Sequence, residues 1–264
     1  MIAVMIPCYN AQATIDRAVR SCLAQSDVRE IILIDDGSTD GTLDILRAYA
    51  SQYPQIKVLQ MPQNGGAAMA RNWGVLHSHA PFLAFLDADD EYLGDAFGFS
   101  LRALATHANL AAIKLPCEFV GWPADVVEHT SFRDTCQILV NTFAGNLLIR
   151  REVFMVIGMF PDDAAFRAEG GEDGAFMVAL RDHFVVGQVE KEPPCVAIYY
   201  HDGSHGYRFF KIAQGEISTR ESQFDTVEAS RIYIEQTKAR LQSLQHLRTS
   251  ELGNGFQPIW QHKS

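Results

Sequence analysis

The first 42 residues read MIAVMIPCYNAQATIDRAVRSCLAQSDVREIILIDDGSTDGT, and this stretch decides the fold class. Two short apolar runs occur in it, at Ile2–Ile6 and at Ile31–Ile34. Between the runs, Ile15, Val19 and Cys22 recur at helical spacing. A continuous apolar run is typical of a strand that a parallel sheet buries on both faces. The stretch therefore predicts a strand, a helix and a second strand.

The same alternation continues through the first ninety residues. Helical and strand-like segments follow one another at Leu43–Tyr49 (helix), Ile56–Leu59 (strand), Ala67–Leu76 (helix) and Phe82–Leu86 (strand). Repeated units of this kind predict an α/β fold with a Rossmann-like, mostly parallel central sheet flanked by helices. Ligands of such sheets bind outside the carboxyl ends of the strands, so polar residues directly after each strand are the candidate site residues.

The second half of the chain is more mixed. Strand-like runs occur at Ala111–Leu115 and Ala197–Tyr200, and a helix is predicted from Asp173 to about His183. We expect one globular domain over residues 1–212 and a helical C-terminal extension over residues 213–264. The apolar stripe of this extension consists of Val227, Ile234, Leu241 and Leu244. Such a stripe packs on its own domain or pairs with a second copy as a homodimer.

Composition excludes several classes of protein. Lys and Arg number 22 against 32 Asp and Glu, so the net charge of −10 argues against nucleic acid or an anionic membrane surface as the main partner. The five cysteines are scattered without a CxxC pair, which favours a reducing compartment. A helix that spans a bilayer needs about 18 consecutive apolar residues, and no apolar run in this chain approaches that length. We expect a cytoplasmic protein, with peripheral association at the inner face of the membrane as an open option.

Two acids, Asp35 and Asp36, end the second apolar strand. A strand-to-helix turn explains the segment Gly37–Thr42 but does not explain these two acids. An ionised carboxylate only accepts hydrogen bonds, which suits the N–H edge of a base or a ribose hydroxyl. Tyr9, which follows the first strand, offers a ring that can stack on a base.

A second acidic group follows the fourth strand in FLDADDE, residues 85–91. Asp87 and Asp89 are two residues apart, so their carboxylates can point the same way and share one hard cation. A solvated acidic turn is the alternative, and the position after a buried strand favours the metal. His201, after a later strand, is a further candidate ligand.

Two more segments carry candidate charges. Arg71 lies in a glycine-rich entry to a helix, where it contacts a phosphate or forms an ion pair with Asp35 or Asp87. Glu172 and Asp173 begin another helix, either as helix caps or, for Asp173, as a general base.

Together, these motifs resemble those of the family 2 glycosyltransferases, inverting enzymes of the GT-A fold that use nucleotide-diphosphate sugars. The matching stretches are IPCYN (Ile6–Asn10), IDDGSTDGT (Ile34–Thr42), NGGAAMARN (Asn64–Asn72), FLDADD (Phe85–Asp90), GGED (Gly170–Asp173) and YYHDGS (Tyr199–Ser204). The likeness extends to about residue 206.

The resemblance implies a role for each matching residue. Asp173 corresponds to the catalytic base, and Asp89 and His201 correspond to ligands of a divalent cation, Mn²⁺ or Mg²⁺. The residues implied in binding the nucleotide sugar are Pro7, Tyr9, Asn10, Asp36, Arg71, Asp87, Ala88 and Glu172. Residues 1–90 are then the nucleotide-sugar-binding half of the domain, and residues 91–212 the half with the acceptor site and the base.

The resemblance also implies a reaction. A hexosyl or N-acetylhexosaminyl unit passes from a nucleotide-diphosphate sugar, with a UDP-sugar favoured, to a hydroxyl of a carbohydrate or lipid-linked glycan. The QxxRW motif of processive synthases is absent, so we expect transfer of a single sugar in cell-surface or exopolysaccharide synthesis. Trp122 is a candidate for stacking on the acceptor. The alternative is a catalytically inactive homologue that binds sugar nucleotides or acts as a scaffold.

Overall fold

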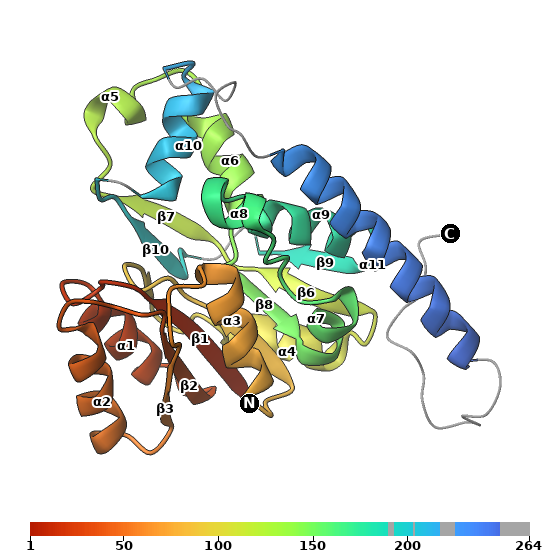
Figure 1. The fold of residues 1–264 in the computed structure, drawn as a ribbon, viewed down its shortest axis with the longest axis horizontal. Helices are drawn as coiled ribbons and strands as arrows, with labels where there is room; N and C mark the ends of the chain where they lie inside the picture. Colours follow the sequence, from red (N-terminus) through yellow and green to blue (C-terminus); the bar gives the residue numbers. More distant parts are fainter. Residues whose placement is uncertain (190–192, 203, 217–224, 249–264) are drawn as a thin grey trace.

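The computed structural model describes residues 1–189, 193–202, 204–216 and 225–248, which form two sheets surrounded by helices (Figure 1). The strands of the larger sheet are β1 (Ile2–Cys8), β2 (Val28–Asp35), β3 (Ile56–Gln60), β4 (Phe82–Phe85), β6 (Leu110–Lys114), β8 (Leu147–Arg150) and β9 (Val185–Gln188). The strands of the smaller sheet are β5 (Glu91–Tyr92), β7 (Cys117–Val120) and β10 (Val196–Tyr199). The helices are α1 (Ile15–Leu23), α2 (Thr42–Gln52), α3 (Ala67–Leu76), α4 (Gly98–Thr106), α5 (Ala124–Val127), α6 (Phe132–Thr142), α7 (Arg151–Ile157), α8 (Ala164–Glu169), α9 (Glu172–His183), α10 (His205–Ala213) and α11 (Thr226–Arg248).

The larger sheet is mostly parallel, as the sequence predicts. Its strand order is β3-β2-β1-β4-β8-β6-β9. Strand β8 runs antiparallel to its neighbours β4 and β6, and the other described pairs in this sheet are parallel. Strands β1, β2, β4 and β6 therefore all end at the same edge of the sheet. This edge carries the candidate site.

Alternate residues of β1 explain why the sheet is covered on both faces. Ile2, Val4 and Ile6 belong to one apolar core, which includes residues of α1, α2 and α4. Ala3 and Met5 belong to the other, which includes residues of α3, α7 and α9. Because side chains alternate along a strand, a run without polar residues fits a strand between two layers of helices.

Helix α11 packs on its own domain, running beside α9 in Figure 1 and contacting α7 and α8 as well. The Tyr233 hydroxyl donates to the carbonyl of Met159 at 2.6 Å, and the buried Thr237 hydroxyl donates to the carbonyl of Ile157 at 3.0 Å. The predicted stripe is wrong at Val227, which is 79% exposed. The face of α11 that contacts the domain is centred on Tyr233 and Thr237, and Val227 lies outside it. Two parts of the predicted extension, residues 217–224 and 249–264, lie outside the described residues.

None of the helices in the described ranges combines the length and the apolar character that crossing a membrane requires.

Candidate active site

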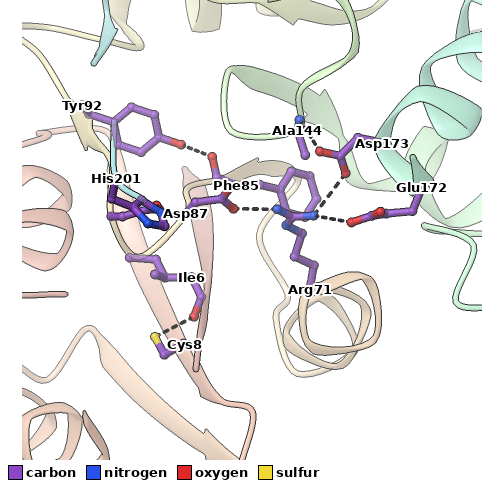
Figure 2. A network of polar contacts seen from close by, with 11 residues as sticks. Ile6, Cys8, Arg71, Phe85, Asp87, Tyr92, Ala144, Glu172, Asp173 and His201 are labelled. Carbon is purple, nitrogen blue, oxygen red and sulfur yellow. Dashed lines mark hydrogen bonds and ion pairs between the residues drawn. The ribbon is translucent and has the colours of Figure 1, made fainter. Parts of the chain in front are cut away.

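The candidate site residues gather at the carboxyl edge of the parallel strands and at the start of α9 (Figure 2). Arg71 reaches this edge from α3, Asp87 follows β4, and Asp173 comes from the first turn of α9. In Figure 2 the Arg71 guanidinium points between Asp87 on one side and the Glu172–Asp173 pair on the other. The chain thus brings three distant segments to one place.

Arg71 makes ion pairs with three carboxylates. Its Nη2 lies 2.6 Å from Oδ1 of Asp87, and its Nη1 lies 3.1 Å from Oδ1 of Asp173 and 3.5 Å from Oε1 of Glu172. The arginine side chain is only 3% exposed. Burial acts to lower the pKa of Arg71, but the nearby carboxylates outweigh it and raise that pKa. Of the two ion pairs anticipated from the sequence, the one with Asp87 is present.

Asp173 is held at both of its carboxylate oxygens. Oδ1 accepts from Arg71, and Oδ2 accepts the backbone N–H of Ala144 at 2.9 Å. Burial raises the pKa of Asp173, and the Arg71 guanidinium opposes this effect. A carboxylate with a raised pKa is a better proton acceptor than an exposed aspartate. Asp173 does not cap α9, because the capping position is occupied by Gly171.

Two glycines set the start of α9. Gly170 and Gly171 have φ values of +76° and +96°, in a region that residues with a Cβ rarely adopt. This backbone turns the chain so that Glu172 and Asp173 both approach Arg71. Burial and the neighbouring Asp173 raise the pKa of Glu172 to about 7.

Asp89 and His201 form the second part of the site. Oδ2 of Asp89 lies 2.7 Å from Nε2 of His201, which follows β10. Strand β10 pairs with β5, directly after the acidic loop, and this pairing brings the histidine to the aspartate. Tyr92 on β5 also donates to the carbonyl of Phe85 at 2.7 Å, which ties the loop back to the end of β4 (Figure 2).

These groups fit a divalent cation. Asp87, Asp89 and Asp90 each offer a carboxylate oxygen, and the three oxygens lie within 4.8 Å of one another. Asp90 is buried and already accepts the backbone N–H of Tyr199 at 2.9 Å. Asp89 and His201 are partly exposed, so they are the better placed to bind an ion from solvent. Carboxylate oxygens suit hard cations such as Mn²⁺ or Mg²⁺.

Asp36 joins two loops at the ends of the strands. Its carboxylate accepts the backbone N–H groups of Gly65 at 2.7 Å and Gly66 at 2.9 Å. Gly37 allows this approach, because a Cβ there would lie 2.9 Å from the backbone nitrogen of Asn64. Asp36 thus shapes the loop before α3, and its contact with a base stays a prediction.

The other residues predicted to bind the nucleotide sugar lie along the same edge of the sheet. Tyr9 is 52% exposed at the end of β1, while Pro7 is half-buried and Ala88 is buried. The Asn10 side chain accepts the backbone N–H of Thr39 at 2.8 Å, which links the loops after β1 and β2. Their roles in binding a nucleotide sugar stay predictions.

Comparison with known proteins supplies the family. The sequence model of glycosyl transferase family 2 matches residues 3–160. The chain belongs to this family. The succinoglycan biosynthesis protein ExoU of Rhizobium meliloti is 38% identical over 97 residues, which are 37% of this chain and 28% of that protein. An uncharacterized glycosyltransferase of Haemophilus influenzae is 35% identical over 118 residues, 42% of this chain and 47% of that protein. The chain thus covers less than half the length of these relatives.

Solved structures support the GT-A fold of this family 2 member. TarS of S. aureus, solved in complex with UDP-GlcNAc, matches with a TM-score of 0.61 and 18% identity over 92% of this chain and 72% of that chain. The mannosyltransferase PcManGT from Pyrobaculum calidifontis, in complex with GDP-Man and Mn²⁺, matches with a TM-score of 0.60 and 18% identity over 95% of this chain and 76% of that chain. At this identity the likeness concerns the fold.

Some residues that build this family 2 site were missed in the sequence. Arg17 on α1 donates to the backbone carbonyl of Asp89, and its guanidinium lies 3.6 Å from the centre of the Tyr199 ring. Ala144 contributes only its backbone N–H. No local motif marks these residues, since the contacts join segments far apart in the chain.

The predicted role of Trp122 in stacking on the acceptor is wrong. The sequence suggested a ring available to an acceptor sugar, but Trp122 is only 9% exposed. It packs against Phe119 and Phe210, and its Nε1 donates to the carbonyl of Ile198 at 3.3 Å. The ring is part of a small apolar core under α5, α6 and α10, so it does not stack on an acceptor in this arrangement.

Proposed function

We propose that this protein is a metal-dependent, inverting glycosyltransferase that moves one sugar from a nucleotide-diphosphate sugar to an acceptor hydroxyl. One arrangement carries the proposal: a single buried guanidinium, that of Arg71, contacts both the candidate base Asp173 and Asp87 of the acidic loop. The base and the cation site must both lie close to one reacting carbon, and this shared contact supports such a placement.

In the proposed reaction, Asp173 takes the proton of the acceptor hydroxyl. The acceptor oxygen forms a bond to the anomeric carbon while the bond from that carbon to the diphosphate oxygen breaks, and its electron pair leaves with the diphosphate. Arg71 and the Ala144 N–H keep the carboxylate of Asp173 oriented for this transfer. A positioned base of this kind contributes about 10²–10⁴-fold to the rate.

Asp89 and His201 are the residues that would hold the cation, with Asp87 beside them. A bound Mn²⁺ or Mg²⁺ supplies positive charge that stabilises the leaving diphosphate. The side chain of Asp89 is fixed by His201, and its backbone carbonyl by Arg17. These two contacts hold the acidic loop against β10 and α1.

The substrate classes follow from the family and its relatives. We infer a hexosyl or N-acetylhexosaminyl donor, with UDP favoured, because TarS was solved with UDP-GlcNAc and shares the fold. A carbohydrate or lipid-linked glycan is the inferred acceptor, in line with the succinoglycan relative. We place the reaction in the cytoplasm or at the inner face of the membrane. Residues 1–212 are the proposed catalytic domain, and α11 uses its Tyr233 face within the same chain.

The test is a transfer assay with two donor probes, UDP-GlcNAc and GDP-mannose, in the presence of Mn²⁺ and a panel of glycoside acceptors. The readouts are release of the nucleoside diphosphate and the anomeric configuration of the product by NMR. Asp173→Asn should abolish transfer and leave nucleotide binding intact. Asp182→Asn, the same change at an exposed position of α9, is the control and should keep full activity.

Two outcomes would contradict the proposal. Normal turnover by Asp173→Asn would remove this residue from the base role. A wild-type protein that binds UDP or GDP but transfers sugar to none of the acceptors would instead support the alternative of a sugar-nucleotide-binding protein without activity.

A further inference from the structure

Lys114 is a buried lysine that has no role in the proposed reaction as described above. It is the last residue of β6, at the same edge of the sheet as the candidate site, and it is 0% exposed. Its amine donates a hydrogen bond to the backbone carbonyl of Phe143. Lysines are rarely buried without a specific partner, because an ammonium group is costly to remove from water.

The carbonyl that Lys114 contacts belongs to the turn between α6 and β8, residues 143–146. The other end of this turn is also tied to the end of β6, where the backbone N–H of Leu115 donates to the carbonyl of Asn146 at 2.8 Å. The Asn146 side chain returns a bond to the carbonyl of Leu115 at 2.9 Å. The turn is thus held at both ends, and Lys114 holds the end at Phe143.

Ala144, which lies between these two contacts, binds the candidate base Asp173. The Ala144 backbone N–H donates to Oδ2 of Asp173 at 2.9 Å, and Ala144 follows Phe143 directly. A contact that fixes the Phe143 carbonyl therefore also fixes the peptide that presents the Ala144 N–H, because a peptide group is planar.

Lys114 and Asp173 also interact through their charges. Burial lowers the pKa of Lys114 to about 7; Cys117 and Asp173 act to raise it, and Arg181 to lower it. The charged groups that act on Asp173 are Arg71, Asp87, Glu172 and Lys114. An amine donates an N–H in its charged and its neutral form, so the bond to Phe143 persists through this titration.

We propose that Lys114 is a positioning residue for Asp173, acting through the Phe143–Ala144 peptide to hold the carboxylate that accepts the proton. This inference rests on the proposed function, in which Asp173 is the base. It assigns a catalytic consequence to a lysine that is wholly buried.

The experiment compares Lys114→Met with Lys57→Met, the same change at an exposed position of β3. UDP-GlcNAc and GDP-mannose are the donors, with the acceptor panel described above. Lys114→Met should lower kcat by up to about 10²-fold, the effect of displacing a reacting group by about 1 Å, with the KM for the donor unchanged. The acidic limb of the kcat–pH profile should move to higher pH, because the loss of a nearby cation makes Asp173 easier to protonate. Lys57→Met should change neither.

A purely structural lysine would give a different result. Lys114→Met would then lower the melting temperature but leave kcat at low temperature and the pH profile unchanged, and this outcome would overturn the inference. Wild-type protein and Asp173→Asn are measured in parallel. Absence of turnover by the wild type, or normal turnover by Asp173→Asn, would count against the proposed function instead.

A second measurement needs no Lys114 variant and no donor. The 13Cε signal of Lys114 is titrated by NMR in the wild type and in Asp173→Asn. In the wild type we expect a midpoint of about 7, and in Asp173→Asn a lower midpoint, because the carboxylate that stabilises the ammonium is absent. An unchanged midpoint would show that the Lys114 amine does not lie near Asp173 in solution, as the contact through the Phe143–Ala144 peptide requires, and would overturn the inference even if Lys114→Met did not fold.

Discussion

Arg71 Nη1 lies 3.1 Å from Oδ1 of Asp173, although 102 positions separate the two residues in the chain. The same guanidinium contacts Asp87 at 2.6 Å. The family resemblance implied a place for Arg71 beside the donor phosphates. In the structure the two terminal nitrogens of Arg71, Nη1 and Nη2, contact carboxylates. The direct effect of Arg71 is therefore to hold Asp173 and to balance the negative charge around it.

Replacement of Arg71 should therefore affect stability as well as activity. Arg71→Met leaves the carboxylates of Asp87, Glu172 and Asp173 without their shared cation, and we expect the free energy of unfolding to fall by about 3–5 kcal/mol. Arg71→Lys keeps the charge but not the forked geometry, so it should lose less stability. Urea denaturation at pH 7 measures both changes.

Arg102→Met removes an exposed arginine from α4 and serves as the control, with an expected change within about 0.5 kcal/mol. If Arg71→Met were as stable as this control, the three ion pairs would not form in solution.

The parallel strands of the first ninety residues could be predicted from local pattern, and the contacts of the site could not. Runs such as Ile2–Ile6 and Ile31–Ile34 have no polar residues because helices cover both faces of the sheet, and this is visible in a single segment. Strand β8 was missed, since Leu147–Arg150 is short and directly precedes a helix without a turn signal.

Motif residues were placed correctly at the strand ends, but their partners depend on tertiary packing. The pairing of His201 with Asp89 requires β10 to lie beside β5, which no local pattern predicts. For α11, the local pattern predicts the helix and two residues that pack on the core, Ile234 and Leu241. It places Val227 on that face wrongly, because Val227 and Tyr233 are both apolar enough to be buried and only the neighbouring helices decide between them.

Glu172 should make stability depend on pH. Burial and Asp173 raise its pKa from 4.5 to about 7 in the folded protein. The folded state then keeps a proton that the unfolded chain releases, so the stabilising contribution is complete below pH 4.5 and is lost as the pH rises through about 7. Glu172→Gln cannot ionise. Relative to the wild type, it should become more stable by about 1–3 kcal/mol between pH 5 and pH 8.

Urea denaturation at the two pH values measures this difference, with Glu152→Gln at an exposed position of α7 as the control. A stability difference between Glu172→Gln and the wild type that is the same at pH 5 and pH 8 would mean that Glu172 titrates normally.

Helix α11 should be part of the folding unit. Tyr233 is 7% exposed and bonds to Met159, so Tyr233→Ala should lower the free energy of unfolding by about 3–5 kcal/mol. Val227→Ala, on the same helix at a residue that is 79% exposed, should change it by less than about 0.5 kcal/mol. Equal effects of the two substitutions, measured by urea denaturation, would contradict the described packing of the helix.

We expect a divalent cation at Asp89 and His201 to strengthen the binding of a nucleoside diphosphate. Isothermal titration calorimetry with UDP, and in parallel with GDP, measures it most directly, in Mn²⁺ and in EDTA, for the wild type, Asp89→Asn and the exposed control Asp44→Asn. The wild type and Asp44→Asn should bind one of the two nucleotides more tightly with Mn²⁺ than with EDTA, and Asp89→Asn should lose that difference. Equal affinity of the wild type in Mn²⁺ and EDTA, or a full Mn²⁺ effect in Asp89→Asn, would contradict the claim.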